Sequence, residues 1–348
     1  MKKMFITGGA GFIGSAVVRN AVKTGYEVLN FDALTYSACL KNLEEVEGLG
    51  NYQFVHGDIT NKNQLEDVML DFKPDCVLHL AAESHVDRSI DGPEQFIQTN
   101  IIGTFNLLQV SRHYLAQEQN HQFKFLHVST DEVFGSLEMN SQECFTESSR
   151  YDPSSPYSAS KASSDHLARA WSRTFDLPII ITNCSNNYGP YQFPEKLIPV
   201  VILNALEGKP IPVYGAGQNV RDWLFVEDHV DALLTVLERG TVGKTYNIGG
   251  NNEVKNIDVV SAICRLLDEI KPKQTSYGAQ IEFVADRPGH DMRYAIDASL
   301  ICGELNWEPK RSLEAGLRET VIWYLENTDW LEGLKNRSGV GYRLGNAK

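Results

Sequence analysis

The sequence has few cysteines, and their spacing excludes the usual cysteine-based sites. The six cysteines are scattered, and none forms the C-x-x-C spacing that metal and redox sites favour. Three histidines, His79, His127 and His229, also lack the convergent spacing of metal ligands. We therefore expect no metal site, and we expect the thiols to be reduced and mostly buried.

Long apolar runs are also missing. No segment approaches the roughly 18 to 20 consecutive apolar residues that a membrane-spanning helix needs. The apolar N-terminal segment resembles a signal peptide only superficially, because Gly8, Gly9, Gly11 and Gly14 interrupt it. We expect a cytosolic protein that does not contact a membrane.

Positive charge is scarce in this chain. It has 45 acidic and 32 basic residues, a formal net charge of −13, and no basic run that could follow a nucleic-acid backbone. The sequence therefore predicts no nucleic-acid partner. An anionic small molecule can still bind where a few arginines, lysines or backbone N–H groups converge.

What the chain does contain is the composition of a globular protein. It has 348 residues, of which 42% are hydrophobic and 22% are charged, and no low-complexity tract. This length is enough for about two domains and for burial of roughly three quarters of the unfolded surface. We therefore expect the chain to be folded throughout.

Short β-rich runs alternate with helix-length segments in the first half of the chain. This alternation predicts right-handed βαβ units and an α/β fold, a Rossmann-type doubly wound parallel sheet. The predicted strands are residues 4–7, 27–31, 52–55, 76–80, 123–128 and 179–182, and helices begin near Phe12, Lys62, Pro93 and Pro156.

The pattern becomes less regular beyond residue 186. Short strands are predicted near Val213 and Leu224, and helices from Glu227, Asn256 and Ser312. We expect a Rossmann domain over residues 1–185, with a returning segment near 219–250. A smaller mixed α/β domain, interleaved with the first, is expected over residues 186–348.

A glycine-rich turn follows the first predicted strand and opens the first helix. Thr7-Gly8-Gly9-Ala10-Gly11-Phe12-Ile13-Gly14 satisfies G-x-G-x-x-G, whose glycines let the backbone approach a pyrophosphate at a helix N-terminus. The second strand ends at Asp32, about 20 residues later, where a carboxylate would bind the adenosine ribose. No Arg or Lys lies between Ala33 and Leu40 to neutralise a 2′-phosphate. The sequence therefore predicts NAD rather than NADP.

Tyr157 and Lys161 are four residues apart just inside a predicted helix start, so both project from one helix face. An ammonium beside a phenol favours the phenolate, and the positive nicotinamide of NAD would act in the same direction. We expect these effects to lower the pKa of Tyr157 from about 10 towards neutrality. Tyr157 is therefore the predicted general base.

Three motifs together resemble the extended short-chain dehydrogenase/reductases, over nearly the whole chain. They are the glycine-rich turn, Leu80-Ala81-Ala82-Glu83-Ser84 and Tyr157-Ser158-Ala159-Ser160-Lys161. A fourth motif after the fifth strand, Ser129-Thr130-Asp131-Glu132-Val133-Phe134-Gly135, narrows the resemblance. Sugar epimerases of this superfamily usually have small hydroxyl residues there, whereas the Asp-Glu pair is similar to the nucleotide-sugar 4,6-dehydratases.

Dehydration of a sugar gives the adjacent carboxyl groups a chemical role. Loss of water across C5 and C6 needs one group to take the C5 proton and another to protonate the departing C6 hydroxyl. Two close carboxyl groups in a desolvated site favour opposite protonation states, because their charges repel. The resemblance implies that Asp131 is the acid and Glu132 the base, and that Thr130 joins Tyr157 at the C4 hydroxyl.

The resemblance also implies a closed redox cycle. C4 is oxidised by hydride transfer to NAD, water is eliminated, and the hydride returns to C6, which gives a 4-keto-6-deoxy sugar nucleotide without net oxidation. NAD is then expected to stay bound as a prosthetic group. Residues 186–199 are most similar to members acting on thymidine-diphosphoglucose (dTDP-glucose). Relatives that act on GDP-, CDP- or UDP-sugars share the chemistry, and nothing physical in the sequence separates thymine from uracil.

The family's contact positions carry over to this chain by resemblance. Arg221 and the run from Asp286 to Asp291 supply the isolated positive groups that a diphosphate needs. The residues expected to contact NAD are Gly8, Gly11, Phe12, Ile13, Gly14, Asp32, Ala33, Leu34, Thr35, Asp58, Ile59, Leu80, Ala81, Ala82, Ser84, Thr99, Tyr157, Lys161 and Asn187. Those expected to contact the sugar nucleotide are Ser84, Thr130, Asn186, Lys196, Leu197, Pro212, Val213, Tyr214, Arg221, Asn256, Asp286, Arg287, His290 and Asp291.

Family members usually dimerise through two long helices, here predicted over residues 93–115 and 156–175, so we expect a homodimer. In the first of these, Ile97, Ile101, Phe105 and Leu108 recur at helical spacing. They predict an apolar stripe that lies in the core or at a subunit interface.

Two other functions remain open at this point. A nucleotide-sugar 4-epimerase would use NAD, Tyr157 and Lys161 but would not need Asp131 and Glu132. A non-catalytic NAD-sensing or scaffold protein would keep the fold and let the site decay, and the intact site argues against it. Product analysis separates the dehydratase from the epimerase.

Overall fold

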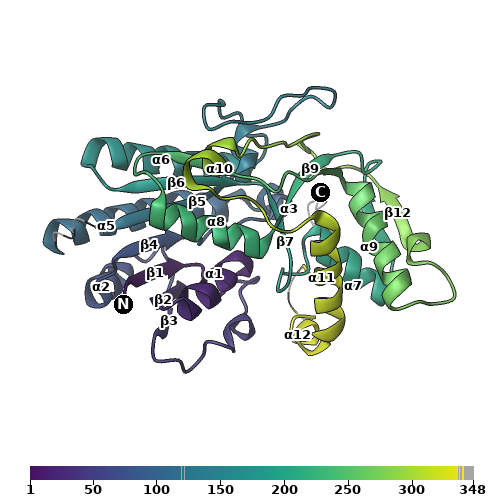
Figure 1. The fold of residues 1–348 in the computed structure, drawn as a ribbon, viewed down its shortest axis with the longest axis horizontal. Helices are drawn as coiled ribbons and strands as arrows, with labels where there is room; N and C mark the ends of the chain where they lie inside the picture. Colours follow the sequence, from purple (N-terminus) through teal and green to yellow (C-terminus); the bar gives the residue numbers. More distant parts are fainter. Residues whose placement is uncertain (119, 121, 336, 338, 341–348) are drawn as a thin grey trace.

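A seven-stranded parallel sheet forms the centre of the molecule in the computed structural model, which describes residues 1–118, 120, 122–335, 337 and 339–340 (Figure 1). The strand order is β10-β6-β5-β4-β1-β2-β3, and every neighbouring pair is parallel. The strands are β1 (Lys3–Thr7), β2 (Glu27–Asp32), β3 (Tyr52–His56), β4 (Cys76–His79), β5 (Lys124–Thr130), β6 (Ile179–Cys184) and β10 (Thr245–Ile248). The predicted Rossmann-type sheet is confirmed, and its six predicted strands are all present.

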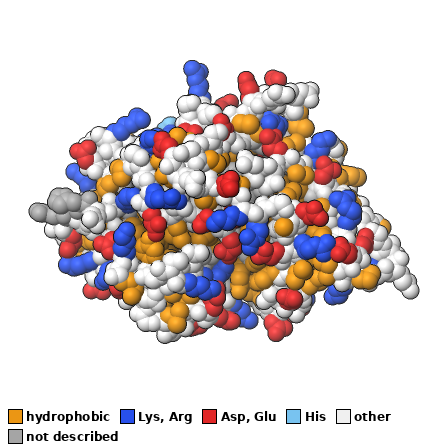
Figure 2. All heavy atoms as spheres, viewed as in Figure 1, with side chains coloured by type: hydrophobic (Ala, Val, Ile, Leu, Met, Phe, Trp, Pro, Cys, Tyr) orange, Lys and Arg blue, Asp and Glu red, His pale blue; other side chains and the backbone are white. Residues whose placement is uncertain are grey.

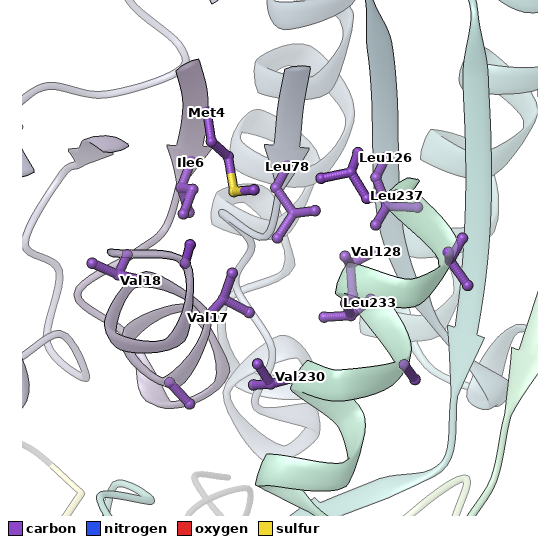
Figure 3. Close-up of a cluster of buried hydrophobic side chains, with 14 of the residues drawn as sticks. Met4, Ile6, Val17, Val18, Leu78, Leu126, Val128, Val230, Leu233 and Leu237 are labelled. Carbon is purple, nitrogen blue, oxygen red and sulfur yellow. The ribbon is translucent and has the colours of Figure 1, made fainter. Parts of the chain in front are cut away.

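Helices cover both faces of this sheet because successive strand residues point to opposite sides. On one side, Met4 and Ile6 pack with α1 (Phe12–Lys23), α8 (Val226–Arg239) and α10 (Ser299–Leu305); Figure 3 shows the part of this cluster between α1 and α8. Phe5 points to the other side, whose cluster includes residues of α2 (Lys62–Phe72), α5 (Thr104–Glu118) and α6 (Pro156–Phe175). Both clusters are almost fully buried, so the sheet is the middle layer of three.

The helix predicted over residues 93–115 is interrupted. After α3 (Val86–Asp91), α4 (Pro93–Phe96) leads into a π-helical turn, η2 (Ile97–Gly103), and then into α5. A π-helical turn changes which side chains share a face, so Leu108 is buried while Ile97 is 43% exposed. The four predicted apolar residues therefore do not form one buried stripe. Asn100 in this turn is buried, and its amide binds the backbone of Glu83 and the hydroxyl of Ser160 at 2.8 to 2.9 Å.

A second hydrophobic core belongs to later parts of the chain. It is built by α7 (Leu197–Leu206), α9 (Asn256–Ile270), α11 (Leu313–Glu326) and α12 (Thr328–Glu332), which lie on the right in Figure 1. Two small sheets accompany it, β11-β9-β7 and the parallel pair β12-β8. Their strands are β7 (Asn186–Tyr188), β8 (Ile211–Tyr214), β9 (Val220–Phe225), β11 (Glu253–Lys255) and β12 (Ile281–Val284), and the short 3-10 turns are η1 (Leu40–Leu43), η3 (Asp131–Phe134) and η4 (Tyr277–Gln280).

The surface carries both signs of charge. On the face shown in Figure 2, Lys and Arg side chains are interspersed with Asp and Glu side chains over apolar patches. In the part of the chain that the structure describes, no helix is both long enough and apolar enough to span a membrane. All six cysteines are free thiols.

Candidate active site

A cavity of about 340 Å³ lies at the carboxyl ends of the main-sheet strands. The chain runs from β1 outwards through β2 and β3 on one side and from β4 through β5 and β6 on the other. The loops after β1 and β4 therefore diverge, which is where ligands bind in open α/β sheets. Residues that follow each of the strands β1 to β6 line the cavity, whose volume is typical of small-molecule sites.

The glycine-rich turn borders this cavity at the N-terminus of α1. Gly8 has φ +75°, and a Cβ there would lie 2.6 Å from the backbone nitrogen of Ala81. A Cβ on Gly14 would lie 2.0 Å from the carbonyl oxygen of Gly8, so both positions require glycine. Gly11 is the N-cap of α1 and offers no side chain to its first N–H groups. Free N–H groups at a helix N-terminus beside a cavity suit a pyrophosphate.

Asp32 lies at the end of β2 and is 7% exposed. Its carboxylate accepts hydrogen bonds of 2.8 Å from the N–H groups of Ala10 and Leu34. Burial raises the pKa of Asp32, and these two N–H donors act in the opposite direction. Asp32 thus ties the glycine-rich turn to the loop after β2 and borders the cavity.

The residues predicted to contact NAD line the cavity, with one exception. Leu34 has φ +50° and packs against the hydrophobic cluster between α1 and α8. Leu34 is therefore not part of the cavity wall, and its contact with NAD stays a prediction.

Tyr157 and Lys161 lie one turn apart at the start of α6. Ser155 caps this helix, since its hydroxyl accepts a hydrogen bond of 3.0 Å from the N–H of Ser158. Tyr157 and Lys161 are 8% and 5% exposed, and both line the cavity. The ammonium of Lys161 donates a hydrogen bond of 2.8 Å to the carbonyl oxygen of Val128.

The expected lowering of the phenol pKa is not produced by the residues of the chain. Burial and the neighbouring Glu132 raise the pKa of Tyr157 well above its usual value, although a hydrogen bond with Thr130 acts in the opposite direction. Burial lowers the pKa of Lys161. The pattern Tyr-x-x-x-Lys predicted that both residues border one cavity, and the lower pKa expected with NAD bound stays a prediction.

Asp131 and Glu132 open η3 directly after β5. The hydroxyl of Thr130 accepts a hydrogen bond of 3.3 Å from the N–H of Glu132 and so caps this turn. Asp131 is 1% exposed, and its Oδ2 has no hydrogen-bond partner among the described residues. Burial, Glu132 and Asp222 together raise the pKa of Asp131 well above its usual value.

Glu132 has different neighbours from Asp131. Burial raises the pKa of Glu132 as well, but Arg287, Lys196 and Arg221 act against it. Of the two groups, Asp131 is therefore protonated more readily, and the cations favour the ionised form of Glu132. One acid and one base then stand next to the phenol of Tyr157 in the same cavity.

The predicted sugar-nucleotide contacts divide into two groups. Ser84, Thr130, Asn186, Lys196 and Leu197 line the cavity, and the ammonium of Lys196 donates a hydrogen bond of 2.7 Å to the carbonyl oxygen of Ser84. The others lie outside its wall, on β8, on β9, at the start of α9 and in the loop after β12: Pro212, Val213, Tyr214, Arg221, Asn256, Asp286, Arg287, His290 and Asp291.

Members of the second group bind one another beside the cavity. Arg221 donates a hydrogen bond of 2.8 Å to the carbonyl oxygen of Asp291 and lies over the ring of Tyr294. The ring of His290 packs edge-on against Tyr214. Val213 is 2% exposed and packs in the second hydrophobic core.

Sequence reasoning missed several polar residues of the cavity wall. Glu195 is 8% exposed and accepts hydrogen bonds from the hydroxyl of Tyr36 at 2.9 Å and from Nε of Arg88 at 3.1 Å. Its only sequence signal was its place next to Lys196. Cys184 also lines the wall, and burial raises the pKa of its thiol to about 12, which makes it a weak nucleophile.

The chain is similar to known proteins over nearly its whole length. The GDP-mannose 4,6-dehydratase family matches residues 5–320. A dTDP-glucose 4,6-dehydratase of Salmonella typhimurium is 57% identical over 345 residues, which cover 96% of each chain. The solved structure of a dTDP-glucose 4,6-dehydratase from Bacillus anthracis in complex with NAD has a TM-score of 0.85 and 47% identity, over 96% of this chain and 100% of that one. The enzyme of the same name from Streptomyces venezuelae, with NAD and TYD bound, has a TM-score of 0.87 and 43% identity, over 96% and 100%.

Proposed function

Because the chain belongs to the GDP-mannose 4,6-dehydratase family, we propose that it removes water from dTDP-glucose, with NAD as cofactor, to give dTDP-4-keto-6-deoxyglucose. The observation that carries this function is the pair Asp131 and Glu132 beside Tyr157 in one buried cavity. A 4-epimerase of the same fold needs no acid and base at C5 and C6. The carboxyl pair therefore favours the dehydratase.

The residues of the cavity fit NAD. The N-terminus of α1 suits the pyrophosphate, and Asp32 suits the adenosine ribose. When bound, NAD supplies a hydride acceptor for C4, a positive charge beside the phenol, and the hydride that returns to C6. The carboxylate of Asp32 would repel a 2′-phosphate, which favours NAD over NADP.

Tyr157 takes the proton of the C4 hydroxyl as C4 is oxidised, and Thr130 holds that hydroxyl. Lys161 lies one helical turn from Tyr157, and in its charged form its ammonium favours the phenolate. A ketone at C4 then acidifies the proton on C5. The chain thereby prepares the sugar for elimination without a strong external base.

Glu132 takes the C5 proton, and Asp131 protonates the departing C6 hydroxyl. The neighbours of each carboxyl group support this division, since cations favour an ionised Glu132 while other carboxylates favour a neutral Asp131. Water leaves across C5 and C6, and C5 is protonated again once C6 is reduced. Net oxidation of the sugar is zero.

The diphosphate is assigned to Lys196, Arg221 and Arg287. All three cations act to lower the pKa of Glu132; Lys196 lines the cavity, and Arg221 and Arg287 lie beside it, in a chain of net charge −13. Arginine binds phosphate through its planar fork of N–H donors. Asn187 is assigned to NAD and Asn186 to the sugar.

Incubation of the purified chain with dTDP-glucose, followed by mass spectrometry, tests this function. The product should have lost one water, and free NAD should not need to be added. An isomer of unchanged mass would instead indicate an epimerase. No turnover of any nucleotide sugar would support the non-catalytic alternative.

We also propose that the chain forms a homodimer through η2, α5 and α6. Ile97 and Ile102 are 43% and 41% exposed in η2, and Phe175 at the end of α6 is 38% exposed. Exposed apolar side chains gathered on packed helices are typical of protein interfaces. Arg112 of α5 lies over the ring of Phe175, which continues this surface across both helices.

The division into two domains and the cytosolic location are proposals as well. The first domain comprises the main sheet with its returning segment near residues 219–250, and the second is built around the other core over most of residues 186–348. Residues 298–307 also pack beneath the main sheet, which adds a second return. The six free thiols support a reducing compartment, which cell fractionation would test.

A further inference from the structure

Asp87 is a buried carboxylate that the reaction described above does not use. It lies in the first turn of α3, just after the cavity-lining segment that follows β4, and is 3% exposed. Its Oδ1 accepts a hydrogen bond of 2.7 Å from Nη1 of Arg287. Its Oδ2 accepts one of 2.6 Å from the hydroxyl of Tyr214. Both oxygens therefore bind residues assigned to the sugar nucleotide.

Tyr214 and Arg287 reach Asp87 from two paired strands. Tyr214 ends β8, and Arg287 follows the end of β12, where Val284 is the register partner of Tyr214. Because these strands are parallel, both residues leave the pair at the same end. α3 belongs instead to the half of the molecule that carries the main sheet. Asp87 is thus a single anchor for two nucleotide-side residues across the two halves.

The opposite charges of Asp87 and Arg287 stabilise each other. Burial alone would raise the pKa of Asp87, but Arg287 and Tyr214 outweigh it and lower the pKa. Burial acts to lower the pKa of Arg287, and Asp87 outweighs that effect. Asp87 and Arg287 therefore stay ionised as a pair, although removing either partner would leave a buried charge unpaired.

Arg287 keeps an unused donor. Its Nε is buried and has no hydrogen-bond partner in the part of the chain that the structure describes. Asp87 holds Nη1, which fixes the plane of the guanidinium. A fixed guanidinium with a spare N–H suits a phosphate oxygen, and its fixed position lowers the entropy cost of binding.

We propose that Asp87 is a positioning residue for nucleotide recognition, which holds Arg287 and Tyr214 in the orientation that binds the diphosphate and its nucleoside. This inference rests on the proposed function, because it takes the ligand to be a nucleoside diphosphate. Asp87 acts through the other two residues. It therefore affects the affinity for the nucleotide much more than the rate at which the bound substrate reacts.

Calorimetric titration of the NAD-loaded chain with thymidine diphosphate tests this role. In Asp87→Asn, Kd should rise about tenfold, the scale of one charge-assisted hydrogen bond. KM for dTDP-glucose should rise in parallel, whereas kcat should change less than twofold because saturating substrate itself holds Arg287. The matched control is Asp91→Asn, which removes the same charge from an exposed position of α3 and should keep the parent Kd.

A cycle of variants shows whether Asp87 acts through its two partners. In the background Arg287→Gln, Tyr214→Phe, the change Asp87→Asn should add less than twofold to Kd. A full tenfold addition there would overturn the inference, as would an unchanged or tighter Kd for Asp87→Asn alone. If Asp87→Asn does not fold, Tyr214→Phe by itself should weaken binding about threefold, and a parent Kd would overturn the role.

Loss of the proposed function and loss of the role of Asp87 alone would give different results. If the unaltered chain binds no thymidine diphosphate and forms no dehydrated product, the proposed function is lost, and the role of Asp87 with it. If the unaltered chain binds and reacts while Asp87→Asn behaves like Asp91→Asn, only the role of Asp87 is lost.

Discussion

The protonation of the two active-site carboxyl groups follows from their different neighbours. Asp131 and Glu132 are adjacent in sequence and both buried, yet Glu132 and Asp222 act most on Asp131, whereas Arg287, Lys196 and Arg221 act most on Glu132. Desolvation alone would neutralise both groups. The cations therefore favour ionisation of Glu132 over ionisation of Asp131.

The elimination and hydride-transfer functions should be separable by mutation. In an Asp131→Asn, Glu132→Gln double variant, the amides nearly keep the side-chain volume but cannot act as acid or base. Bound dTDP-glucose should still reduce NAD, which gives a lasting absorbance of NADH without dehydrated product. Tyr157→Phe should give neither signal. Release of dehydrated sugar by the double variant at the parent rate would remove the carboxyl pair from the mechanism.

Asp32 should determine the choice between NAD and NADP. Asp32→Asn removes the charge that repels a 2′-phosphate but keeps an oxygen for the N–H groups of Ala10 and Leu34. Affinity for NAD should fall by about tenfold or more, the scale of a hydrogen bond to a charged group, and discrimination against NADP should fall too. Fluorescence titration of the cofactor-free chain measures both.

The control for this experiment is Asp58→Asn, which alters another carboxylate of the cavity wall. It should weaken NAD and NADP to a similar extent. If Asp32→Asn keeps the parent's full preference for NAD over NADP, Asp32 does not determine that preference.

For single residues, residue type and spacing predicted which side chains line the cavity but not the charge states of those side chains. Tyr157, Lys161, Asp131 and Glu132 meet because each motif follows or faces the carboxyl end of a parallel strand. The charge of Glu132 depends on Arg287, which is far away in sequence. No local pattern marks such a contact, and Asp87 was missed for the same reason.

Among the elements, the π-helical turn η2 has the clearest effect on function. It turns Asn100 inwards, where its amide binds Glu83 and Ser160, and leaves Ile97 and Ile102 exposed. The turn therefore serves both the site and the outer surface. Helical spacing in the sequence does not reveal this turn. The extra residue of a π-helical turn changes the helix face on which every later residue lies.

The exposed isoleucines of η2 should hold the homodimer together. In Ile97→Glu, Ile102→Glu, two charges would have to be buried at the interface, so the chain should sediment as a monomer. Ile322→Glu is the control, since Ile322 is 37% exposed on α11, away from this surface. Analytical ultracentrifugation measures the mass. A double variant with the mass of the parent would contradict the proposed interface.

The helix α7 shows where element prediction failed. Its sequence is apolar on nearly every side, and all but the first and last of its residues are buried. Such a run has no polar face, so its periodicity does not distinguish a helix from a buried strand. α11 was predicted correctly because it has a capping serine, Ser312, and polar residues on its exposed side.

For the whole molecule, the sequence could predict the main sheet but not all of the later segments that join it or cover its faces. β10 joins the edge of the main sheet next to β6, and α8 and α10 cover the same face as α1 (Figure 1). The returning segment near 219–250 was expected, whereas the return at residues 298–307 was not. α10 is too short for the spacing of its apolar residues to predict which hydrophobic core it joins.

The molecule buries several histidines, and this should make its stability depend on pH. His79, His85, His127 and His229 are at most 6% exposed. Burial lowers the pKa of each of them, to about 3 for His229 and about 4 for His85. Each is therefore neutral in the folded chain. As pH falls below the ordinary value of 6.5, the unfolded chain takes up these protons and the folded chain does not, so stability is lost.

His229 offers the cleanest test of this effect, because burial is the only cause of its shift. Its Nδ1 hydrogen-bonds to the side-chain oxygen of Asn187 at 2.8 Å, a contact that His229→Asn can imitate without a titratable ring. Between pH 7 and pH 5, the unfolding free energy of the parent should fall by about 2 kcal/mol more than that of His229→Asn. Denaturant titration followed by circular dichroism measures both chains. The exposed His166 provides the control, and His166→Asn should follow the parent. Equal pH dependence of parent and His229→Asn would mean that His229 is not held neutral by the fold.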